Sequence, residues 1–178
     1  YIPGPGEPRK HLSYNQFGDL ATQVAKGLRN IGVEKGDRVA IIIDNSVQWA
    51  ALSYGANALG AAYTAMYTHQ HGKDWAYIIA DATPKVVAVA NTEVLDKLCG
   101  ALPADGWPAS GVILLGDEPA NQLPPEGVEV RSWMEFTQEG RASADLEEIA
   151  DDPSALSTLI YTSGTTGNPK GVMLSNWN

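Results

Sequence analysis

The sequence predicts an α/β fold with mostly parallel sheets that are flanked by helices. Apolar, β-branched segments alternate along the chain with segments of helical spacing, which is the pattern of βαβ units. Gly, Pro, Asn and Asp separate these segments and mark turns. Near the end of the chain, one strand-like segment runs directly into a loop rich in glycine and hydroxyl side chains.

The clearest helix is expected between Ser13 and Gly32. Ser13 and Gln16 have the spacing of a capping box. Apolar residues then recur at helical spacing, at positions 17, 20, 21, 24, 25, 28 and 31. Gly32 is a natural stop because glycine readily adopts the left-handed backbone that ends many helices.

The other elements follow from the same signals. Strands are expected over residues 38–43, 61–64, 85–90, 112–115, 128–130, 155–161 and 172–174. Further helices are expected from a cap at Asn45 or Ser46 to about Gly60, over 73–80, from a cap at Thr92 to Leu98, and for one turn from Ser132 through Phe136. Segments 116–127 and 140–152 are predicted to be loops, the second a polar surface connection.

Charge and cysteine content limit the classes of function. The 178 residues contain 12 Lys and Arg against 21 Asp and Glu, a net charge of −9. Such an acidic surface repels phosphate backbones, so nucleic acid is excluded as the expected partner. The single cysteine, Cys99, permits no internal disulfide and fits a reducing compartment.

The segment Thr162–Gly171 carries the strongest chemical signal. It contains three glycines, four hydroxyl side chains and one lysine. Glycines let the backbone approach an anion closely, and successive amides can then point into one concavity. Lys170 adds a point charge suited to phosphate, and hydroxyl oxygens can ligate the magnesium that a nucleotide carries. The segment therefore predicts a phosphate-binding loop.

The spacing differs from two common nucleotide motifs. A P-loop needs four residues between its glycines and a Ser or Thr after the lysine, whereas Gly164 and Gly167 are closer and Gly171 follows Lys170. The dinucleotide fingerprint, Gly-x-Gly-x-x-Gly, is also absent here. On composition alone, a Ser/Thr/Gly turn that merely links two strands stays open as the alternative.

The complete string Tyr161-Thr-Ser-Gly-Thr-Thr-Gly-Asn-Pro-Lys-Gly-Val172 closely resembles the AMP-binding signature of the adenylate-forming superfamily. The resemblance extends over nearly the whole chain and is most similar to long-chain acyl-CoA synthetases. It is carried also by the segments 12–14, 32–39, 45–49, 60–67 and 77–81. It is weakest between Gly100 and Ala150. It implies that residues 1–178 are a partial N-terminal AMP-binding domain, the front part of the large domain of such an enzyme.

The resemblance implies ATP-dependent activation of a fatty acid to an acyl-adenylate, followed by transfer of the acyl group to coenzyme A. It places ATP phosphates against Thr162, Ser163, Gly164, Thr165, Thr166, Gly167 and Lys170. Thr162 is the expected Mg²⁺ ligand. The superfamily's later motifs, including its catalytic residues, are expected beyond Asn178, so the chain alone is expected to be inactive. Many relatives have His where Asn176 stands, which leaves the role of Asn176 open.

The resemblance leaves several alternatives open. Within the class, the acid could be aryl, or the acceptor could be a carrier-protein thiol. A non-catalytic nucleotide-binding homologue is the alternative of another class. A cytoplasmic enzyme is expected, and a lipid substrate makes peripheral membrane contact compatible with it.

Other chemistry-bearing residues have ordinary structural interpretations. His69 and His71 lack the further ligands that a metal needs. Tyr63, Tyr67 and Trp75 could line an acyl tunnel, but core packing is the favoured interpretation. Asp44 could face a ligand or cap a helix. The acidic positions 145, 147, 148, 151 and 152 are interpreted as a solvated loop.

Overall fold

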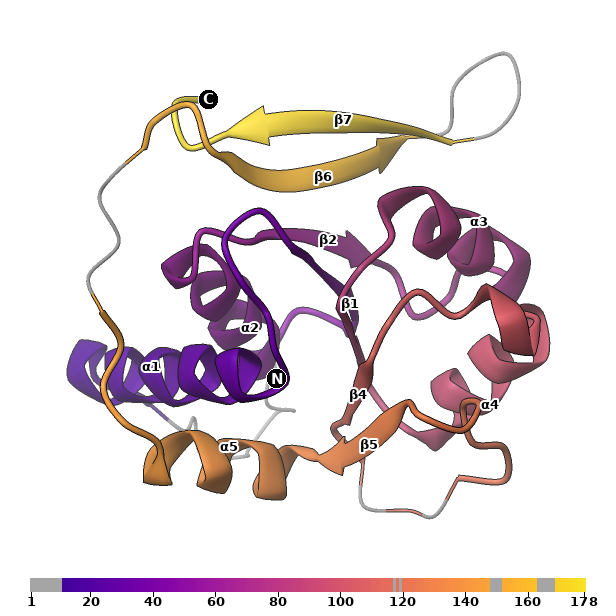
Figure 1. Ribbon diagram of the computed structural model, residues 1–178, viewed down its shortest axis with the longest axis horizontal. Coiled ribbons are helices and arrows are strands. Elements are labelled where there is room, and N and C mark those ends of the chain that lie inside the picture. Colours follow the sequence, from indigo (N-terminus) through magenta and orange to yellow (C-terminus); the bar gives the residue numbers. More distant parts are fainter. Residues whose placement is uncertain (1–10, 117, 119, 148–151, 163–168) are drawn as a thin grey trace, which may run out of the picture.

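The computed structural model describes residues 11–116, 118, 120–147, 152–162 and 169–178. Its strands form one sheet in the order β5-β4-β3-β1-β2-β6-β7 (Figure 1). The strands are β1 Arg38–Ile42, β2 Ala62–Met66, β3 Val86–Val89, β4 Gly111–Leu114, β5 Glu129–Ser132, β6 Leu156–Thr162 and β7 Lys170–Ser175. All neighbours are parallel except β6 and β7. The predicted α/β class is confirmed, and the described strands make a single sheet.

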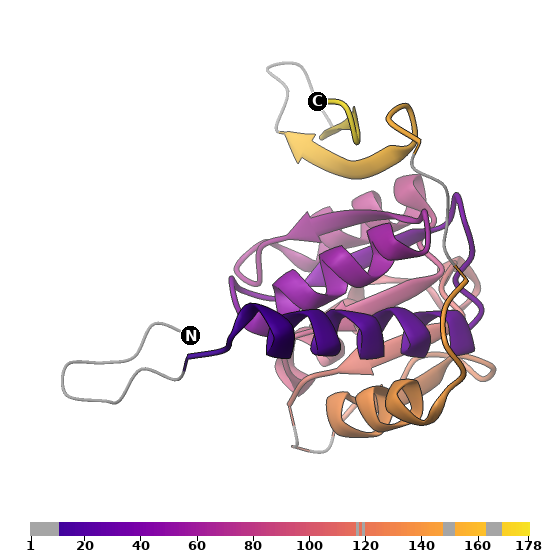
Figure 2. The ribbon, with the colours of Figure 1, turned by 90° about the vertical axis from the view of Figure 1, so that its left-hand side faces the viewer.

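Helices cover both faces of this sheet. They are α1 Tyr14–Asn30, α2 Val47–Ala58, α3 Gly72–Ala82, α4 Thr92–Ala101 and α5 Trp133–Ala142, with a short 3-10 turn, η1, at Ala104–Gly106. α1 packs against α2 and α5 on one face, and α3 packs against α4 on the other. Figure 2 shows the hairpin of β6 and β7 above this helix-covered body.

The central strand β1 shows why the inner parallel strands β1, β3 and β4 are almost entirely apolar. Val39 and Ile41 belong to the core on the α1, α2 and α5 side. Ala40 and Ile42 belong to the core on the α3 and α4 side. All four are completely buried, because a parallel strand with helices on both faces has no solvent side.

The first helix forms as the sequence predicts. The Ser13 hydroxyl accepts a hydrogen bond from the Gln16 amide at 3.2 Å, and the Gln16 side chain accepts from the Ser13 amide at 2.8 Å. The helix ends at Asn30, and Gly32 has a φ of +89°. Local capping chemistry therefore sets both ends of α1.

Two helix predictions need correction. Asn91, not Thr92, caps α4: its side chain accepts from the Val94 amide at 2.9 Å, because Thr92 already lies inside the helix. α5 is ten residues long instead of one turn. Burial of Phe136 and close packing of Gly140 on α1 extend it, so the predicted surface loop from Gly140 starts too early.

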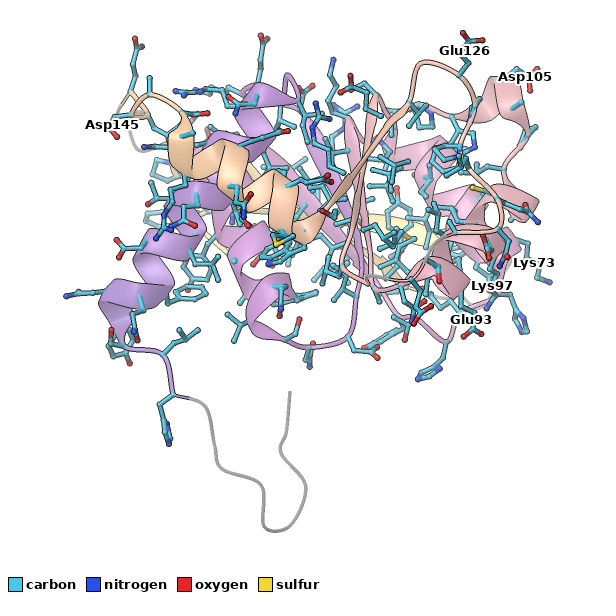
Figure 3. All side chains as sticks on the ribbon, turned by 90° about the horizontal axis from the view of Figure 1, so that it is seen from below. Lys73, Glu93, Lys97, Asp105, Glu126 and Asp145 are labelled. Carbon is cyan, nitrogen blue, oxygen red and sulfur yellow. The ribbon has the colours of Figure 1, made fainter. Side chains whose placement is uncertain are left out.

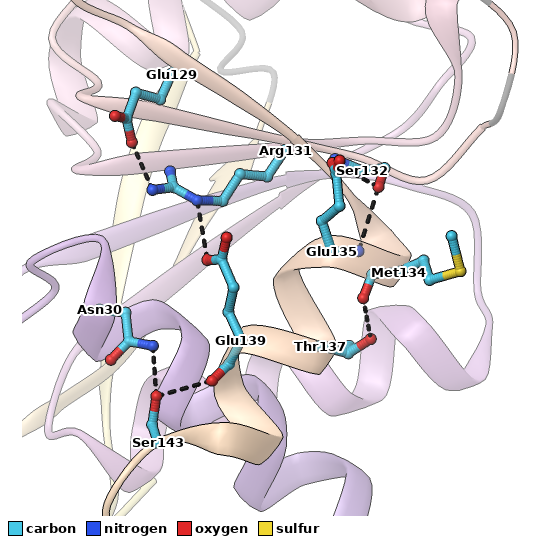
Figure 4. A network of polar contacts seen from close by, with 9 residues as sticks. All are labelled: Asn30, Glu129, Arg131, Ser132, Met134, Glu135, Thr137, Glu139 and Ser143. Carbon is cyan, nitrogen blue, oxygen red and sulfur yellow. Dashed lines mark hydrogen bonds and ion pairs between the residues drawn. The ribbon is translucent and has the colours of Figure 1, made fainter.

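A polar network joins α5 to its neighbours (Figure 4). Arg131 of β5 forms ion pairs with Glu129 and, at 3.2 Å, with Glu139 of α5. The Ser143 hydroxyl accepts from Asn30 of α1 at 2.6 Å and donates to the Glu139 carbonyl at 2.8 Å. These contacts stabilise the β5 edge of the sheet, which is the edge opposite the hairpin of the glycine-rich loop.

Candidate functional site

The hairpin of β6 and β7 places the two ends of the glycine-rich loop side by side. β6 ends at Thr162 and β7 begins at Lys170. The two residues are register partners in the antiparallel ladder. A hydroxyl and an ammonium group thus emerge from neighbouring backbone positions, which suits phosphate oxygens and a nucleotide-bound Mg²⁺.

The other residues predicted to bind phosphate lie outside the described part of the chain. These are Ser163, Gly164, Thr165, Thr166 and Gly167. Their contacts with phosphate, and the assignment of Thr162 to Mg²⁺, therefore stay predictions.

A cleft opens beside this hairpin because β2 and β6 separate. Their parallel register consists of Tyr63 with Thr158 and Thr64 with Leu159. Residues of both strands, together with the segment after β1 and Trp49 of α2, enclose about 750 Å³. The lining residues are Ile43, Asp44, Asn45, Trp49, Tyr63, Ala65, Met66, Tyr67 and Thr158 to Thr162. The size is that of a small-molecule site.

The cleft lies at the carboxyl ends of three parallel strands. Asp44 follows β1, Tyr67 follows β2 and Thr162 ends β6. Ligands of open α/β sheets bind at this edge. Asp44 accepts a hydrogen bond from the Thr68 hydroxyl at 2.7 Å, so it ties the ends of β1 and β2 together, while Ser46 caps α2.

The aromatic residues divide into two groups. Trp49 and Tyr63 meet edge to face at 6.0 Å and line the cleft, as does the exposed Tyr67. Trp75 is fully buried, and its indole donates to the Tyr67 carbonyl at 3.1 Å. Core packing is therefore confirmed for Trp75 and for Tyr63, which packs against the core and also lines the cleft. It is wrong for Tyr67, which is exposed at the cleft.

Tyr161 makes a contact that the sequence patterns did not reveal. Its phenol donates a 2.6 Å hydrogen bond to Asp81 of α3, 80 residues away in sequence. Burial raises the pKa of the Tyr161 phenol far above its ordinary value, and the hydrogen bond to Asp81 raises it further. The phenol therefore stays protonated. The only sequence signal was its place in the signature string, since no local pattern connects the two positions.

The remaining candidates have structural explanations. Asn176 donates to the Asp152 carbonyl at 3.1 Å, which ties the end of β7 to the segment before β6. Asp145 pairs with Lys26 at 2.7 Å. Burial raises the pKa of the Cys99 thiol, so it is not an activated nucleophile.

The described residues contain no group of three or more His, Cys, Asp or Glu that could hold a metal ion. His69 and His71 are therefore not part of such a group. Within the same residues, no helix is long and apolar enough to cross a membrane.

The chain is an α/β domain in which the two ends of the predicted phosphate-binding loop, Thr162 and Lys170, lie in the β6–β7 hairpin beside the carboxyl edge of the parallel strands. The sequence model of the AMP-binding enzyme family matches residues 5–178. The chain therefore belongs to the AMP-binding enzyme family, as its signature string predicts.

Relatives and solved structures agree with this assignment. The long-chain-fatty-acid–CoA ligase ACSBG1 of Macaca fascicularis is 34% identical over 176 residues, covering 95% of this chain and 23% of the relative. The fatty acyl CoA synthetase structure from Mycobacterium tuberculosis has a TM-score of 0.69 and 26% identity, covering 93% of this chain and 29% of that one. The anthranilate CoA ligase AuaEII, at 24% identity, shares the fold with a TM-score of 0.78 over 95% of this chain and 30% of that one. The chain thus spans about a quarter of the length of its curated relatives.

Proposed function

We propose that the native protein containing this chain activates a fatty acid with ATP and Mg²⁺ and then transfers the acyl group to coenzyme A. The observation that carries the proposal is the pairing of Thr162 with Lys170 at the mouth of the signature loop. The names of the relatives, long-chain-fatty-acid–CoA ligases, support the choice of acid and thiol.

The proposed reaction has two balanced steps. A carboxylate oxygen of the acid attacks the α-phosphorus of ATP, the α–β anhydride bond breaks, and pyrophosphate leaves. The thiol sulfur of coenzyme A then attacks the acyl carbon and gives up its proton to solvent, the acyl–phosphate bond breaks, and AMP leaves with the electron pair. Both steps depend on positioning and on neutralising phosphate charge.

The described residues supply part of that work. Lys170 would neutralise charge on the departing pyrophosphate, and the Thr162 hydroxyl would face the same phosphates or their Mg²⁺. Ser163, Gly164, Thr165, Thr166 and Gly167 would complete the phosphate contacts. The cleft beside Thr162 is continuous with this edge and offers a largely apolar wall for another part of a substrate.

The test is ATP–pyrophosphate exchange by the native protein with a panel of acids. We expect exchange that depends on long-chain fatty acids, followed by formation of the acyl-CoA when coenzyme A is added. Exchange with aryl acids but not with fatty acids would contradict the fatty-acid proposal and identify the substrate as an aryl acid. ATP binding with no exchange for any acid would contradict the enzyme proposal and favour a non-catalytic nucleotide-binding protein.

A further inference from the structure

The hairpin that carries Thr162 and Lys170 is attached to the rest of the domain mainly near the start of β6. There, Thr158 and Leu159 pair with β2. The Thr158 hydroxyl donates to the Tyr63 carbonyl at 3.0 Å, and the side chains of Ser157 and Asn57 meet at 3.2 Å. None of these contacts reaches the end of β6 that enters the glycine-rich loop.

The loop end of the hairpin has a separate attachment. For the last three residues of β6, one side-chain hydrogen bond among the described residues leads to another element. It is the 2.6 Å bond from the Tyr161 phenol to Asp81 near the end of α3. Tyr161 immediately precedes Thr162, so this bond acts one residue from the proposed phosphate contact.

Gly171 makes room for the Tyr161 ring. The two residues are register partners across β6 and β7. A Cβ at position 171 would lie 3.0 Å from Cζ and 3.2 Å from Cε1 and the hydroxyl oxygen of Tyr161. The ring therefore lies across the β7 backbone next to Lys170, and the Tyr161 side chain also packs against the core on the α3 and α4 side of the sheet.

The position of Asp81 is unusual for a residue that only serves its helix. It is the penultimate residue of α3, which ends at Ala82. A negative charge there opposes the helix dipole. Asp81 gains a charge-assisted hydrogen bond from a partly buried phenol instead. The carboxylate thus serves the contact between α3 and the hairpin.

We propose that Tyr161, Asp81 and Gly171 form a latch that fixes the loop end of the β6–β7 hairpin onto α3. The latch sets where Thr162 and Lys170 stand relative to the carboxyl edge of the sheet. Tyr161 and Asp81 are positioning residues, and their effect on catalysis rests on the function proposed above.

The test uses Tyr161→Phe, Asp81→Asn and the double variant in the native protein. Tyr54→Phe and Asp105→Asn are matched controls, because Tyr54 is an exposed tyrosine of α2 and Asp105 an exposed acid of η1. Amide hydrogen exchange of residues 160–162 and 170–172 reports the attachment without any need for activity. We expect it to become about fivefold faster in each latch variant, with no further increase in the double variant.

The kinetic readout separates positioning from general destabilisation. In acid-dependent pyrophosphate exchange, we expect the KM for ATP to rise about fivefold in the latch variants while the KM for the acid and the melting temperature change little. Latch variants that match both controls in amide exchange and in the KM for ATP overturn the proposal.

Failure of the proposed function would be recognised separately. If the wild-type protein gives no pyrophosphate exchange with any acid, the proposed function is contradicted. Amide exchange alone then decides the latch: faster exchange in Tyr161→Phe and Asp81→Asn supports it, and unchanged exchange overturns it.

Discussion

Thr162 and Lys170 face each other across the antiparallel ladder of β6 and β7, at the last and the first position of these strands. Eight positions separate them in sequence, yet their backbones are neighbours. The hydroxyl and the ammonium group therefore start from neighbouring backbone positions. This pairing is the basis for proposing that an otherwise acidic domain binds phosphate here.

Replacing Lys170 by Ala should lower kcat/KM for pyrophosphate exchange by about 10²-fold, because one charged contact to the phosphates is lost. Lys73→Ala is the control: Lys73 is an exposed lysine of α3, at the α3 and α4 end of the molecule (Figure 3). It should leave exchange unchanged. Equal activity of both variants would exclude Lys170 from phosphate binding.

Gly140→Ala should lower the free energy of unfolding by about 3 kcal/mol, because a Cβ there would lie 2.0 Å from the backbone oxygen of Gln23 in α1. Gly18→Ala is the matched variant: it is also inside a helix, with nothing within 4 Å of its Cβ. It should raise stability by about 0.5–1 kcal/mol. Urea unfolding measures both, and effects of the same sign would disprove the close packing of α1 with α5.

Trp75→Ala should destabilise the protein by about 3–5 kcal/mol, because it empties a fully buried site. It also removes the indole hydrogen bond to Tyr67. Trp177 is 80% exposed, so Trp177→Ala should change stability by less than about 0.5 kcal/mol. Thermal unfolding compares the two. A small loss of stability in Trp75→Ala, combined with a changed preference among acids, would indicate that Trp75 contacts the substrate.

The N-terminus of α5 should make stability depend on acid pH. Hydrogen bonds from the Ser132 hydroxyl and amide lower the pKa of Glu135. A carboxyl whose pKa is lowered by folding contributes stability above its unfolded pKa and loses it as pH falls through the folded value. The melting temperature should therefore drop as pH falls below about 4.5, the ordinary value for Glu.

Ser132→Ala tests this cause, because it removes the side chain that both caps α5 and binds Glu135. Its melting temperature should be lower than that of the wild type at pH 7, and the difference should shrink toward pH 3. A difference that stays constant over this range would show that Glu135 does not link the cap to pH.

Local chemistry made much of this fold predictable. The capping box at Ser13 and the left-handed glycine at position 32 define α1, and the buried β-branched run defines β1. The lengths of helices were harder to predict from the sequence where tertiary contacts determine them. α5 continues past one turn because Phe136 and Gly140 pack against α1, and no local signal in α5 reports a partner more than a hundred residues away.

The site was predictable only in part, because some of its contacts also join residues that are distant in sequence. The signature string identified the loop, and its ends at Thr162 and Lys170 can be located in the hairpin. The hydrogen bonds of Asp44 with Thr68 and of Asp81 with Tyr161 join residues 24 and 80 positions apart. Such contacts depend on the order of strands in the sheet, which the sequence pattern alone does not determine.

The most direct test is a structure of the native protein with Mg²⁺ and a non-hydrolysable ATP analogue. We expect terminal phosphate oxygens within hydrogen-bonding distance of the Thr162 hydroxyl and the Lys170 ammonium group. An analogue bound at another edge of the sheet, with both side chains turned to solvent, would contradict it.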